Sequence, residues 1–540
     1  MYQQAYDPVV HSLGLSAIFA AAPLTVMFVM LGGFKRSPQV SALVSLLACI
    51  AVAVLVYGTP LPTAVNFALY GAAFSLLTVI WIILNAIWIY NLTVASGHFA
   101  VLRQSFARLS DDPRIQGIIV AFCFGALIEA LAGAGTPIAI ASAMLVALGF
   151  EPMTAVILSL IGDTAPVAFG ALAVPIYTLA QVTGLPFDAL GSMVARQTAV
   201  MSTLLPFVLV YVVDGRRGVR ECWPAALAAG VAFGAVQFAT ANYVSIPITD
   251  IFAVIASAGA VVLVIRLGIS GARPSLVAAT HAPPPHAGAR ETLRAYSPYI
   301  YVVVVFSLAQ LGPVQRLLAH GGTKFAWPGL AVADAAGKTV NTSYNFNFTS
   351  ASGTLLLLCG LLTMWTLRVP VATAWRCFRA TLYQLRWAIP TVLCVLGVAF
   401  VMNWSGQSAT LGRFLAGAGP LFAIISPVVG WIGVVVTGSD NSTNALFGAL
   451  QVAAANATGL PPVLLAAANT AGGVLGKIIS PQSLAVGAAA VGLIGREGDV
   501  FRAVLGWTLL LLAVLCVLVF LQSTPVLGWM LVAVTPSMHP

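Results

Sequence analysis

Charged residues are scarce in this sequence: Asp, Glu, Lys and Arg account for 7% of its 540 residues, whereas apolar residues account for 60%. Soluble domains carry roughly a quarter charged residues. A globular protein of this length could not hide so much apolar surface, because a folded surface still needs polar groups that face water. The scarcity of charge therefore excludes a soluble domain and predicts a protein embedded in a lipid bilayer.

Motifs built from cysteine or histidine are also lacking. No cysteines form a CxxC pair, and most lie within apolar runs, so neither a disulfide framework nor a zinc site is indicated. The six histidines lie in predicted loops, termini or interfaces. No metal-binding His pair, paired aspartate or Ser/His arrangement of an intramembrane protease is visible. We therefore expect no enzyme activity.

The first ten residues lack the basic stretch of a secretory signal peptide, since they contain Asp7 and no Lys or Arg. We therefore expect no cleaved leader. The net charge of +9 does not indicate a nucleic-acid partner. Cytoplasmic loops of membrane proteins are enriched in Lys and Arg, and this enrichment accounts for the excess.

Sixteen apolar segments recur along the chain. The hydrocarbon core of a bilayer is about 30 Å thick and needs about 20 residues of helix to cross it. Segments 153–180 and 461–494 exceed one plain crossing and contain Pro and polar breaks. The segments are 11–33, 39–57, 63–92, 115–131, 137–150, 153–180, 192–213, 222–240, 246–265, 296–311, 351–367, 387–404, 421–437, 444–458, 461–494 and 504–523.

The distribution of basic residues predicts the orientation. With residue 1 outside, eighteen Lys and Arg fall in cytoplasmic stretches and four fall outside. Because positive charge concentrates on the cytoplasmic side, we predict a multi-pass protein of the bacterial inner membrane with both termini outside. Residues 267–295 contain three consecutive prolines and are predicted to form a flexible cytoplasmic linker. Residues 312–350 are predicted to form a longer polar loop outside.

Five ionisable residues interrupt the apolar segments: Glu129, Asp163, Arg196, Asp440 and Lys477. A charged group at membrane depth is costly unless it is satisfied, and such residues mark substrate or ion pathways. All five lie in two regions, 115–213 and 421–494. We therefore place the functional site in these two regions.

The two regions share one order of features: a polar break, a short apolar helix, a Gly/Pro turn, an apolar helix and a second polar break. By the charge count, segment 115–131 starts in the cytoplasm and segment 421–437 starts outside, so the regions lie upside down relative to each other. Inverted repeats with broken helices at mid-membrane are a recurrent plan of secondary transporters. The sequence therefore predicts an all-α, polytopic membrane protein with inverted repeats, broken helices and helical hairpins.

A helix interrupted within the bilayer leaves a half-helix N-terminus, which carries roughly half a positive charge and suits a carboxylate. The breaks therefore predict a binding site for a small carboxylate. The candidate substrate-binding residues are Gly133, Gly135, Thr136, Thr164, Arg196, Gly438, Ser439, Asp440, Asn441, Asn444, Asn469, Lys477, Ser480 and Gln482.

Structural interpretations of the same residues remain open. Gly133 and Gly135 could form only a packing kink, since Gly and Pro are frequent in membrane helices. Residues 439–444 could simply cap the following helix. Arg196 and Lys477 could extend to the water interface. A channel is disfavoured, because the polar residues form two discrete breaks rather than a repeated pore lining.

Long and unusual residue strings lie along the chain, and the most specific, Ala468-Asn469-Thr470, Gly476-Lys477 and residues 479–483, lie in the second region with polar breaks. Through these strings and others, the sequence resembles the lactate permease family of bacterial proton-coupled transporters over nearly the whole chain. The resemblance implies uptake of L-lactate, D-lactate or glycolate with protons, without a cofactor. The wider ion-transporter superfamily implies helical hairpins and an elevator-like movement. The strings are Tyr6-Asp7-Pro8, residues 122–126 up to Glu129, residues 164–171, Gly438-Ser439-Asp440, residues 444–448, Ala468-Asn469-Thr470, Gly472-Gly473, Gly476-Lys477 and residues 479–483.

The sequence also departs from the family pattern. The family stretch after the matching Glu usually reads Gly-Ala-Ala-Gly-Phe-Gly-Ala-Pro, whereas residues 130–137 here read Ala-Leu-Ala-Gly-Ala-Gly-Thr-Pro. A bulky Phe is thus replaced by Ala134, and Thr136 adds a hydroxyl. Asp163 stands where the family usually has Asn. These changes preserve the fold and the broad class, but they question lactate as the substrate.

Proton coupling needs a group that takes up and releases a proton during the cycle, and Glu129 and Asp163 are the candidates. Glu129 is favoured because it matches the family pattern. Lys477 is expected to attract the substrate carboxylate or to balance Asp440. Sodium coupling is the alternative, since Asp440, Asn441 and unwound carbonyls offer oxygen ligands. The sequence leaves the oligomeric state open.

The expected domain organisation places the site in two repeats surrounded by other membrane helices. The division is 1–114, N-terminal membrane helices; 115–213, transport repeat 1; 214–266, membrane helices; 267–295, linker; 296–420, membrane helices with the outer loop 312–350; 421–495, transport repeat 2; and 496–540, the C-terminal membrane helix.

Overall fold

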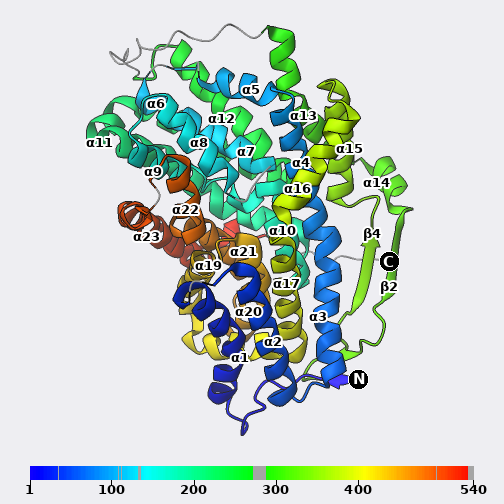
Figure 1. The fold of residues 1–540 in the computed structure, drawn as a ribbon. Helices are drawn as coiled ribbons and strands as arrows, with labels where there is room; N and C mark the ends of the chain where they lie inside the picture. Colours follow the sequence, from blue (N-terminus) through cyan, green and yellow to red (C-terminus); the bar gives the residue numbers. More distant parts are fainter. Residues whose placement is uncertain are drawn as a thin grey trace.

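Helices make up most of the chain in the computed structural model, which describes residues 1–34, 36–107, 109–110, 112–131, 135–271, 288–309, 311–493 and 495–532 (Figure 1). Within these ranges, ten helices are long and apolar enough to cross a membrane, or twelve if two bent pairs each count as one span. The predicted all-α, polytopic membrane fold is confirmed. Two small two-stranded sheets are the exception.

The number of predicted apolar segments, sixteen, is larger than the number of spans among the described residues, for a physical reason. Segments 192–213 and 222–240 lie in two helical arms that the non-helical residues Asp214 and Gly215 separate, and these arms pack against each other closely enough that a Cβ at Gly230 would meet the carbonyl oxygen of Thr203. Segments 137–150 and 351–367 form helices shorter than 18 residues. An apolar run alone does not distinguish a full crossing from a hairpin arm, since both bury apolar side chains. The membrane orientation of the termini stays a prediction.

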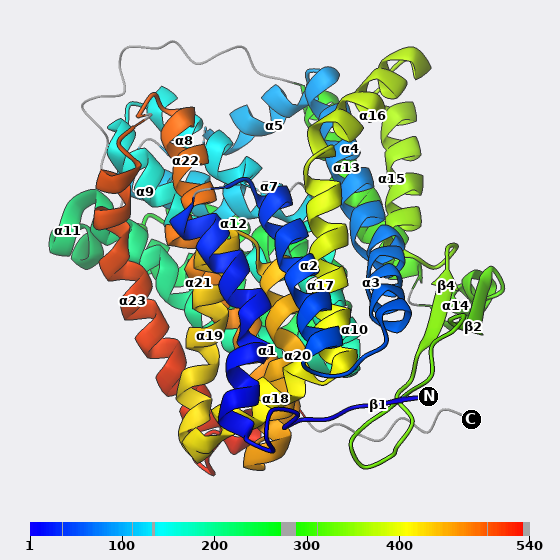
Figure 2. The ribbon, with the colours of Figure 1, turned by 60° about the horizontal axis from the view of Figure 1, so that its bottom comes forward.

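The N-terminal part packs against helices from late in the chain. In Figure 2, α1 and α2 lie side by side, and α2 and α3 both contact α17. The elements are β1 (Tyr2–Gln3), α1 (Leu13–Phe28), η1 (Val29–Gly33), α2 (Pro38–Leu55), α3 (Leu61–Ser75), η2 (Leu76–Ile80), α4 (Trp81–Ala95) and α5 (His98–Ala107). Strand β1 pairs in parallel with β3, which fixes the N-terminus against the loop after α14.

The first region with polar breaks begins with a stretch, residues 114–131, that is buried along its whole length. Its helices α9 and α10 are bent by 60° around the break that follows Gly162. Within α10, Ala171, Leu172 and Ala173 have φ values of 45°, 57° and 65°, a left-handed conformation that costs roughly 1–2 kcal/mol per residue. The elements are α6 (Pro113–Gly117), η3 (Ile118–Phe124), α7 (Gly125–Leu131), α8 (Thr136–Ala147), α9 (Pro152–Gly162), η4 (Val167–Phe169) and α10 (Gly170–Thr183).

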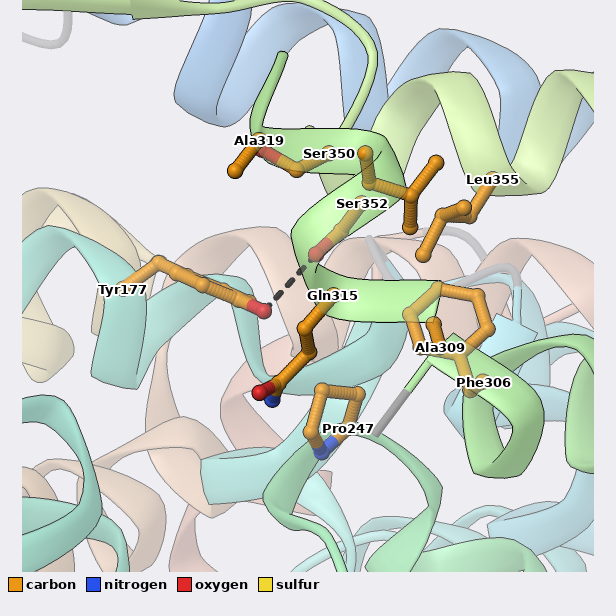
Figure 3. A pocket seen from close by; sticks show the side chains of 10 residues that line it. Tyr177, Pro247, Phe306, Ala309, Gln315, Ala319, Ser350, Ser352 and Leu355 are labelled. Atoms are coloured by element: carbon orange, nitrogen blue, oxygen red, sulfur yellow. Dashed lines mark hydrogen bonds between the residues drawn. The ribbon is translucent and has the colours of Figure 1, made fainter. Parts of the chain in front are cut away.

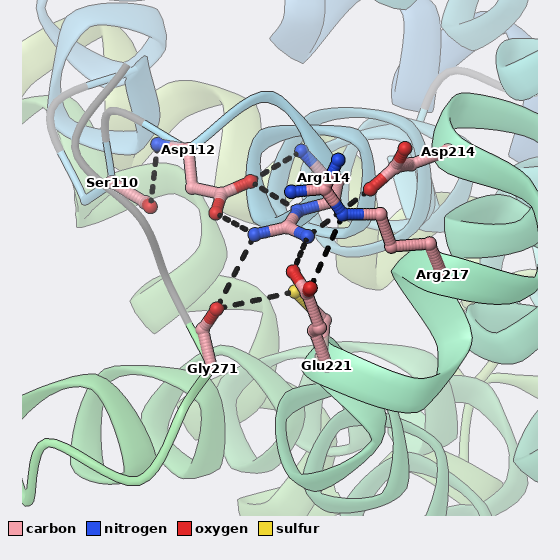
Figure 4. A network of polar contacts seen from close by, with 8 residues as sticks. Ser110, Asp112, Arg114, Asp214, Arg217, Glu221 and Gly271 are labelled. Carbon is pink, nitrogen blue, oxygen red and sulfur yellow. Dashed lines mark hydrogen bonds and ion pairs between the residues drawn. The ribbon is translucent and has the colours of Figure 1, made fainter.

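An arginine-centred ion-pair network ties the start of this region to the long helix α11 (Phe187–Tyr243), which is kinked at Asp214 and Gly215 (Figure 4). Arg114 pairs with Asp112 at 2.7 Å, Asp214 at 3.1 Å and Glu221 at 2.6 Å. Its Nη2 also donates to the carbonyl of Gly271 at 3.3 Å. The network therefore fixes the entry into α6 relative to both arms of α11.

The middle of the chain contains the predicted linker and loop. Most of the linker, 272–287, lies outside the described residues, and α13 already begins at Ala289. The loop 312–350 is more ordered than predicted, because it contains a helix and a β-hairpin in which Gly322 pairs with Asn347. The elements are η5 (Ile246–Ile248), α12 (Thr249–Arg266), α13 (Ala289–Ala309), α14 (Gly312–Ala319), β2 (Gly322–Ala326), β3 (Val332–Ala333), β4 (Ser343–Asn347), α15 (Ser352–Thr366) and α16 (Val371–Leu385).

The second region with polar breaks packs tightly because of small residues. A Cβ added at Gly430 would collide with the backbone of Asn469, and one at Gly472 with that of Pro427. Glycine thus lets α19 and α21 touch backbone to backbone, as small residues do between membrane helices. The elements are α17 (Ala388–Ser405), α18 (Gln407–Leu415), η6 (Ala416–Leu421), α19 (Phe422–Thr437), α20 (Asp440–Thr458), α21 (Pro462–Gly476), η7 (Lys477–Ile479), α22 (Pro481–Ala490), α23 (Glu497–Gln522) and η8 (Gly528–Met530).

Candidate functional site

A buried cluster of three charges joins the two regions. The Nζ atom of Lys477 lies 2.9 Å from Oε1 of Glu129 and 2.9 Å from Oδ2 of Asp163. Exposed fractions of 7%, 3% and 2% place all three residues away from water. The two carboxyls also interact with each other. Charges predicted separately in each region thus meet at one point, where one ammonium faces two carboxyls.

Two members of the cluster lie at the end of a helix, and the third lies where another segment packs closely against its helix. Lys477 begins the 3-10 turn η7 at the end of α21, and Asp163 caps the C-terminus of α9. Glu129 lies on α7, opposite Gly170. A Cβ at position 170 would stand 2.8 Å from Oε1 of Glu129, so glycine is required for this approach.

Asp440 lies near this cluster but does not pair with Lys477. It is the first residue of α20, which Ser439 caps by accepting a hydrogen bond from the amide of Ser442 at 3.3 Å. Its side chain abuts Gly473, one turn before Lys477, and interacts electrostatically with that lysine. Neither carboxyl oxygen has a hydrogen-bond partner in the part of the chain that the structure describes. Lys477 thus forms ion pairs with Glu129 and Asp163, and it acts on Asp440 electrostatically without an ion pair.

Buried amides connect α20 to α21 and to the first region. Asn444 donates to the carbonyl of Pro175 at 3.1 Å and accepts from Asn469 at 2.9 Å and Thr470 at 3.0 Å. Gln451 donates to Asn469 at 3.2 Å. Asn441 accepts a short hydrogen bond from Thr178 of α10. Two predicted binding residues, Asn441 and Asn444, thus connect the two regions, whereas Asn469 links α21 to α20 within the second region.

Asn444→Ala is expected to destabilise the protein, because it leaves buried partners on α10 and α21 without a hydrogen bond. Each such stranded group costs about 1–3 kcal/mol. The midpoint of thermal unfolding of the purified protein measures this effect. Asn456→Ala, at an exposed position of the same helix, is the control and should leave the midpoint unchanged. An unchanged midpoint for Asn444→Ala would show that the network does not hold the regions together.

The hairpin tips converge around α22. Gly135, in a left-handed conformation at the start of α8, lies against Val486, and Gly438 lies against Gln482. Ser480 caps α22 by accepting from the amide of Ser483 at 3.3 Å. Pro481 and Gln482 are exposed, whereas Ser483 and Leu484 are buried. The start of α22 thus reaches the molecular surface four to five residues after the buried Lys477.

Three other predicted residues have less direct positions. Thr164 is buried in the break after α9 and donates to the carbonyl of Leu160 at 3.3 Å. Thr136 begins α8 and is partly exposed. Gly133 lies outside the described residues, so its predicted role stays a prediction.

Arg196 is separated from the charge cluster. It donates to Oδ1 of Asn242 at 3.1–3.2 Å and to the carbonyls of Met530 and Leu531 at 2.7 and 2.9 Å. Its neighbour Gln197 contacts the carbonyl of Leu464. Leu464 precedes Lys477 by thirteen residues, which is about 20 Å of helix rise. The structure therefore does not bring Arg196 together with Lys477.

One buried carboxyl was missed by sequence reasoning. Asp250, 1% exposed, lies in the first turn of α12 and accepts from Gln237 at 3.3 Å. Gln237 also donates to the carbonyl of Ala165 in the break after α9 and interacts with Thr198 and Ser202. An acidic residue inside the apolar segment 246–265 was the available signal. Its electrostatic interaction with Glu129 places it at the edge of the charge cluster.

A separate cavity of about 260 Å³ lies between α10, η5 and the helices around the 312–350 loop (Figure 3). Tyr177 and Ser352 hydrogen-bond across it at 2.7 Å. None of the predicted binding residues lines this cavity. The charge cluster, rather than this cavity, is therefore the candidate functional site.

The fold and the buried charges define the class as a multi-pass membrane protein built around broken helices. Residues 16–526 match the family described as L-lactate permease. The glycolate permease GlcA of Escherichia coli (strain K12) is 38% identical over 97% of this chain and 98% of its own length. The L-lactate permease of the same strain is 38% identical over 98% and 100%.

The chain belongs to the L-lactate permease family. Its family and relatives are permeases, so it is a transporter and not an enzyme. Among solved structures, the YdaH transporter of Alcanivorax borkumensis is similar, with a TM-score of 0.45 and 15% identity over 83% of this chain and 86% of that one. This similarity is too low to support further parallels.

Proposed function

We propose that this protein imports a small 2-hydroxy monocarboxylate, lactate or glycolate, together with a proton across the bacterial inner membrane. The names of its relatives support the substrate class. We infer the coupling of substrate to a proton from the position of Lys477 between Glu129 and Asp163. This cluster contains two carboxylates and only one ammonium.

The charges of these three side chains explain why substrate and proton would move together. One ammonium and two carboxylates leave one uncompensated negative charge, which is costly in a buried site. A proton on Glu129 releases the ammonium of Lys477 for the carboxylate of the substrate. The loaded site then has the same net charge as the empty one. Substrate without a proton would add a second negative charge, so uncoupled movement is disfavoured.

In this proposal, the exchange takes place within the domain organisation predicted from the sequence. Residues 115–213 and 421–495 serve as the two transport repeats, with the other membrane helices around them. The substrate carboxylate enters beside Gln482 and reaches Lys477 past the N-termini of α20 and α22, where Ser439 and Ser480 cap the helices. Those N-termini favour an anion by their partial positive charge.

The test is uptake of labelled lactate and glycolate into proteoliposomes, with a pH gradient and a sodium gradient imposed separately. We expect accumulation when the outside is acidic and no response to sodium. Accumulation driven by sodium alone would contradict proton symport and favour the sodium-coupled alternative. The unpaired carboxyl of Asp440 would then be the first ligand to examine.

The variant Asp440→Asn distinguishes proton coupling from sodium coupling by changing a single residue. If Glu129 carries the coupling proton, this variant should retain pH-driven accumulation, because Asn preserves the shape of the side chain. The initial rate of lactate uptake at a fixed pH gradient is the measurement. Complete loss of uptake in correctly inserted protein would show that Asp440 takes part in coupling.

A further inference from the structure

A groove of about 620 Å³ runs along the outer surface of α11, between its two arms, and is separate from the transport site. Ala199 and Thr203 line it from one arm, and Val231 and Ala235 from the other. Val231 and Ala235 are exposed, so the groove opens toward the surroundings of the helices. In a protein with this many membrane spans, apolar residues exposed along a spanning helix face lipid.

A cation closes one end of this groove. Arg196 lies beside Phe238, with its guanidinium carbon 6.0 Å from the ring centroid. Its hydrogen bonds go to a side-chain amide oxygen and two backbone carbonyls, all uncharged. No carboxylate forms an ion pair with it within the described ranges. The positive charge of Arg196 is therefore satisfied in hydrogen bonding but lacks a counter-ion.

Aromatic side chains show that this end lies at the level of the membrane interface. Tyr243 and Trp529, both lining the groove, are each 76% exposed. Tyr and Trp concentrate where the hydrocarbon core meets the headgroups, because their rings are apolar and their tips polar. Arg196 is thus at headgroup level, while Thr203, seven residues further along α11, lies about 10 Å deeper.

We propose that this groove binds a phospholipid with an anionic headgroup, whose charge is neutralised by Arg196 and whose acyl chain lies between the arms of α11. The volume falls within the range of about 300–1,000 Å³ of small-molecule sites. Charge complementarity selects an anionic over a zwitterionic lipid. The apolar depth of the groove selects a lipid over a free anion.

The test measures thermal unfolding of the full-length protein in detergent, with added phosphatidylglycerol, phosphatidylcholine or inorganic phosphate. We expect phosphatidylglycerol to raise the midpoint by roughly 2–4 °C over phosphatidylcholine at saturation. Equal shifts with both lipids, or an equal shift with inorganic phosphate, would overturn the proposal.

Variants assign the effect to the groove. Arg196→Gln and Ala235→Trp, which fills the groove from its exposed side, should each lose the difference between the two lipids. Arg196→Lys and Asn242→Ala, which preserve the positive charge, should retain it. If Asn242→Ala also lost the difference, the effect would depend on the hydrogen bonds that hold Arg196 rather than on its charge, and this result would contradict the proposal. A difference that persists in Arg196→Gln or in Ala235→Trp would contradict the proposal as well.

Discussion

Lys477→Met is expected to abolish uptake of lactate. The ammonium is the cation that Glu129 and Asp163 share, and the proposed transport cycle passes it from a carboxyl to the substrate. Breaking a buried ion pair costs about 3–5 kcal/mol. Since every 1.4 kcal/mol is tenfold, binding should weaken by about 100-fold or more. Initial uptake of labelled lactate into proteoliposomes measures the loss.

Two further variants make the result interpretable. Lys324→Met removes an exposed lysine of β2 and should transport normally. Lys477→Met combined with Glu129→Gln removes an uncompensated negative charge, so it should insert and fold better than Lys477→Met alone while still failing to transport. Normal uptake by Lys477→Met would exclude this lysine from the site.

Glu129→Gln is expected to separate substrate binding from proton coupling. Gln has the shape of a protonated Glu, so Lys477 stays available for the substrate but no proton is carried. Accumulation driven by a pH gradient should therefore disappear. Exchange of labelled for unlabelled lactate, with equal pH on both sides, should remain. Both are measured in the same proteoliposomes.

Asp163→Asn is the matched control for this variant. It also removes a carboxyl from Lys477, but the family resemblance places an Asn at this position, so pH-driven accumulation should persist. Accumulation by Glu129→Gln at the level of the unmodified protein would exclude Glu129 as the proton carrier. Loss in Asp163→Asn with retention in Glu129→Gln would transfer the role to Asp163.

The sequence identified the members of the charge cluster but not their pairing. Glu129, Asp163 and Lys477 were recognisable because a charge within an apolar run needs a reason. Lys477 is 348 residues from Glu129, and no local pattern encodes a contact over that separation. Which carboxyl the lysine meets depends on the packing of whole helices, so the choice between these partners and Asp440 required the structure.

Two other residues show where reasoning from apolar runs is weakest. Arg196 was grouped with the site because it lies in the same sequence region, but the kinked geometry of α11 places it beside the C-terminal segment. Asp250 was overlooked because it stands near the end of an apolar segment, where a charge usually reaches water. Its burial follows from the 3-10 turn of residues 246–248 before it, which tertiary packing determines.

The class of the fold could be predicted from the sequence, but some of its local details could not. Composition and broken apolar runs were sufficient to predict an all-α, polytopic membrane protein, because the bilayer leaves few alternatives to helices. The β-hairpin within 312–350 and the left-handed residues 171–173 were not predictable, since strand pairing and an unfavourable backbone conformation are both imposed by surrounding contacts. Such a strained stretch, beside Gly170 and Glu129, fits a region that changes conformation.

The central claim is that the site has the same net charge when empty and when loaded with substrate and proton. Proteoliposomes with an internal pH indicator test it directly, by recording proton entry and labelled lactate entry together while the membrane potential is varied. We expect one proton to enter with each lactate and the steady-state accumulation of lactate to be independent of the membrane potential. Lactate entry without protons, an accumulation that depends on the membrane potential, or entry that requires sodium would contradict it.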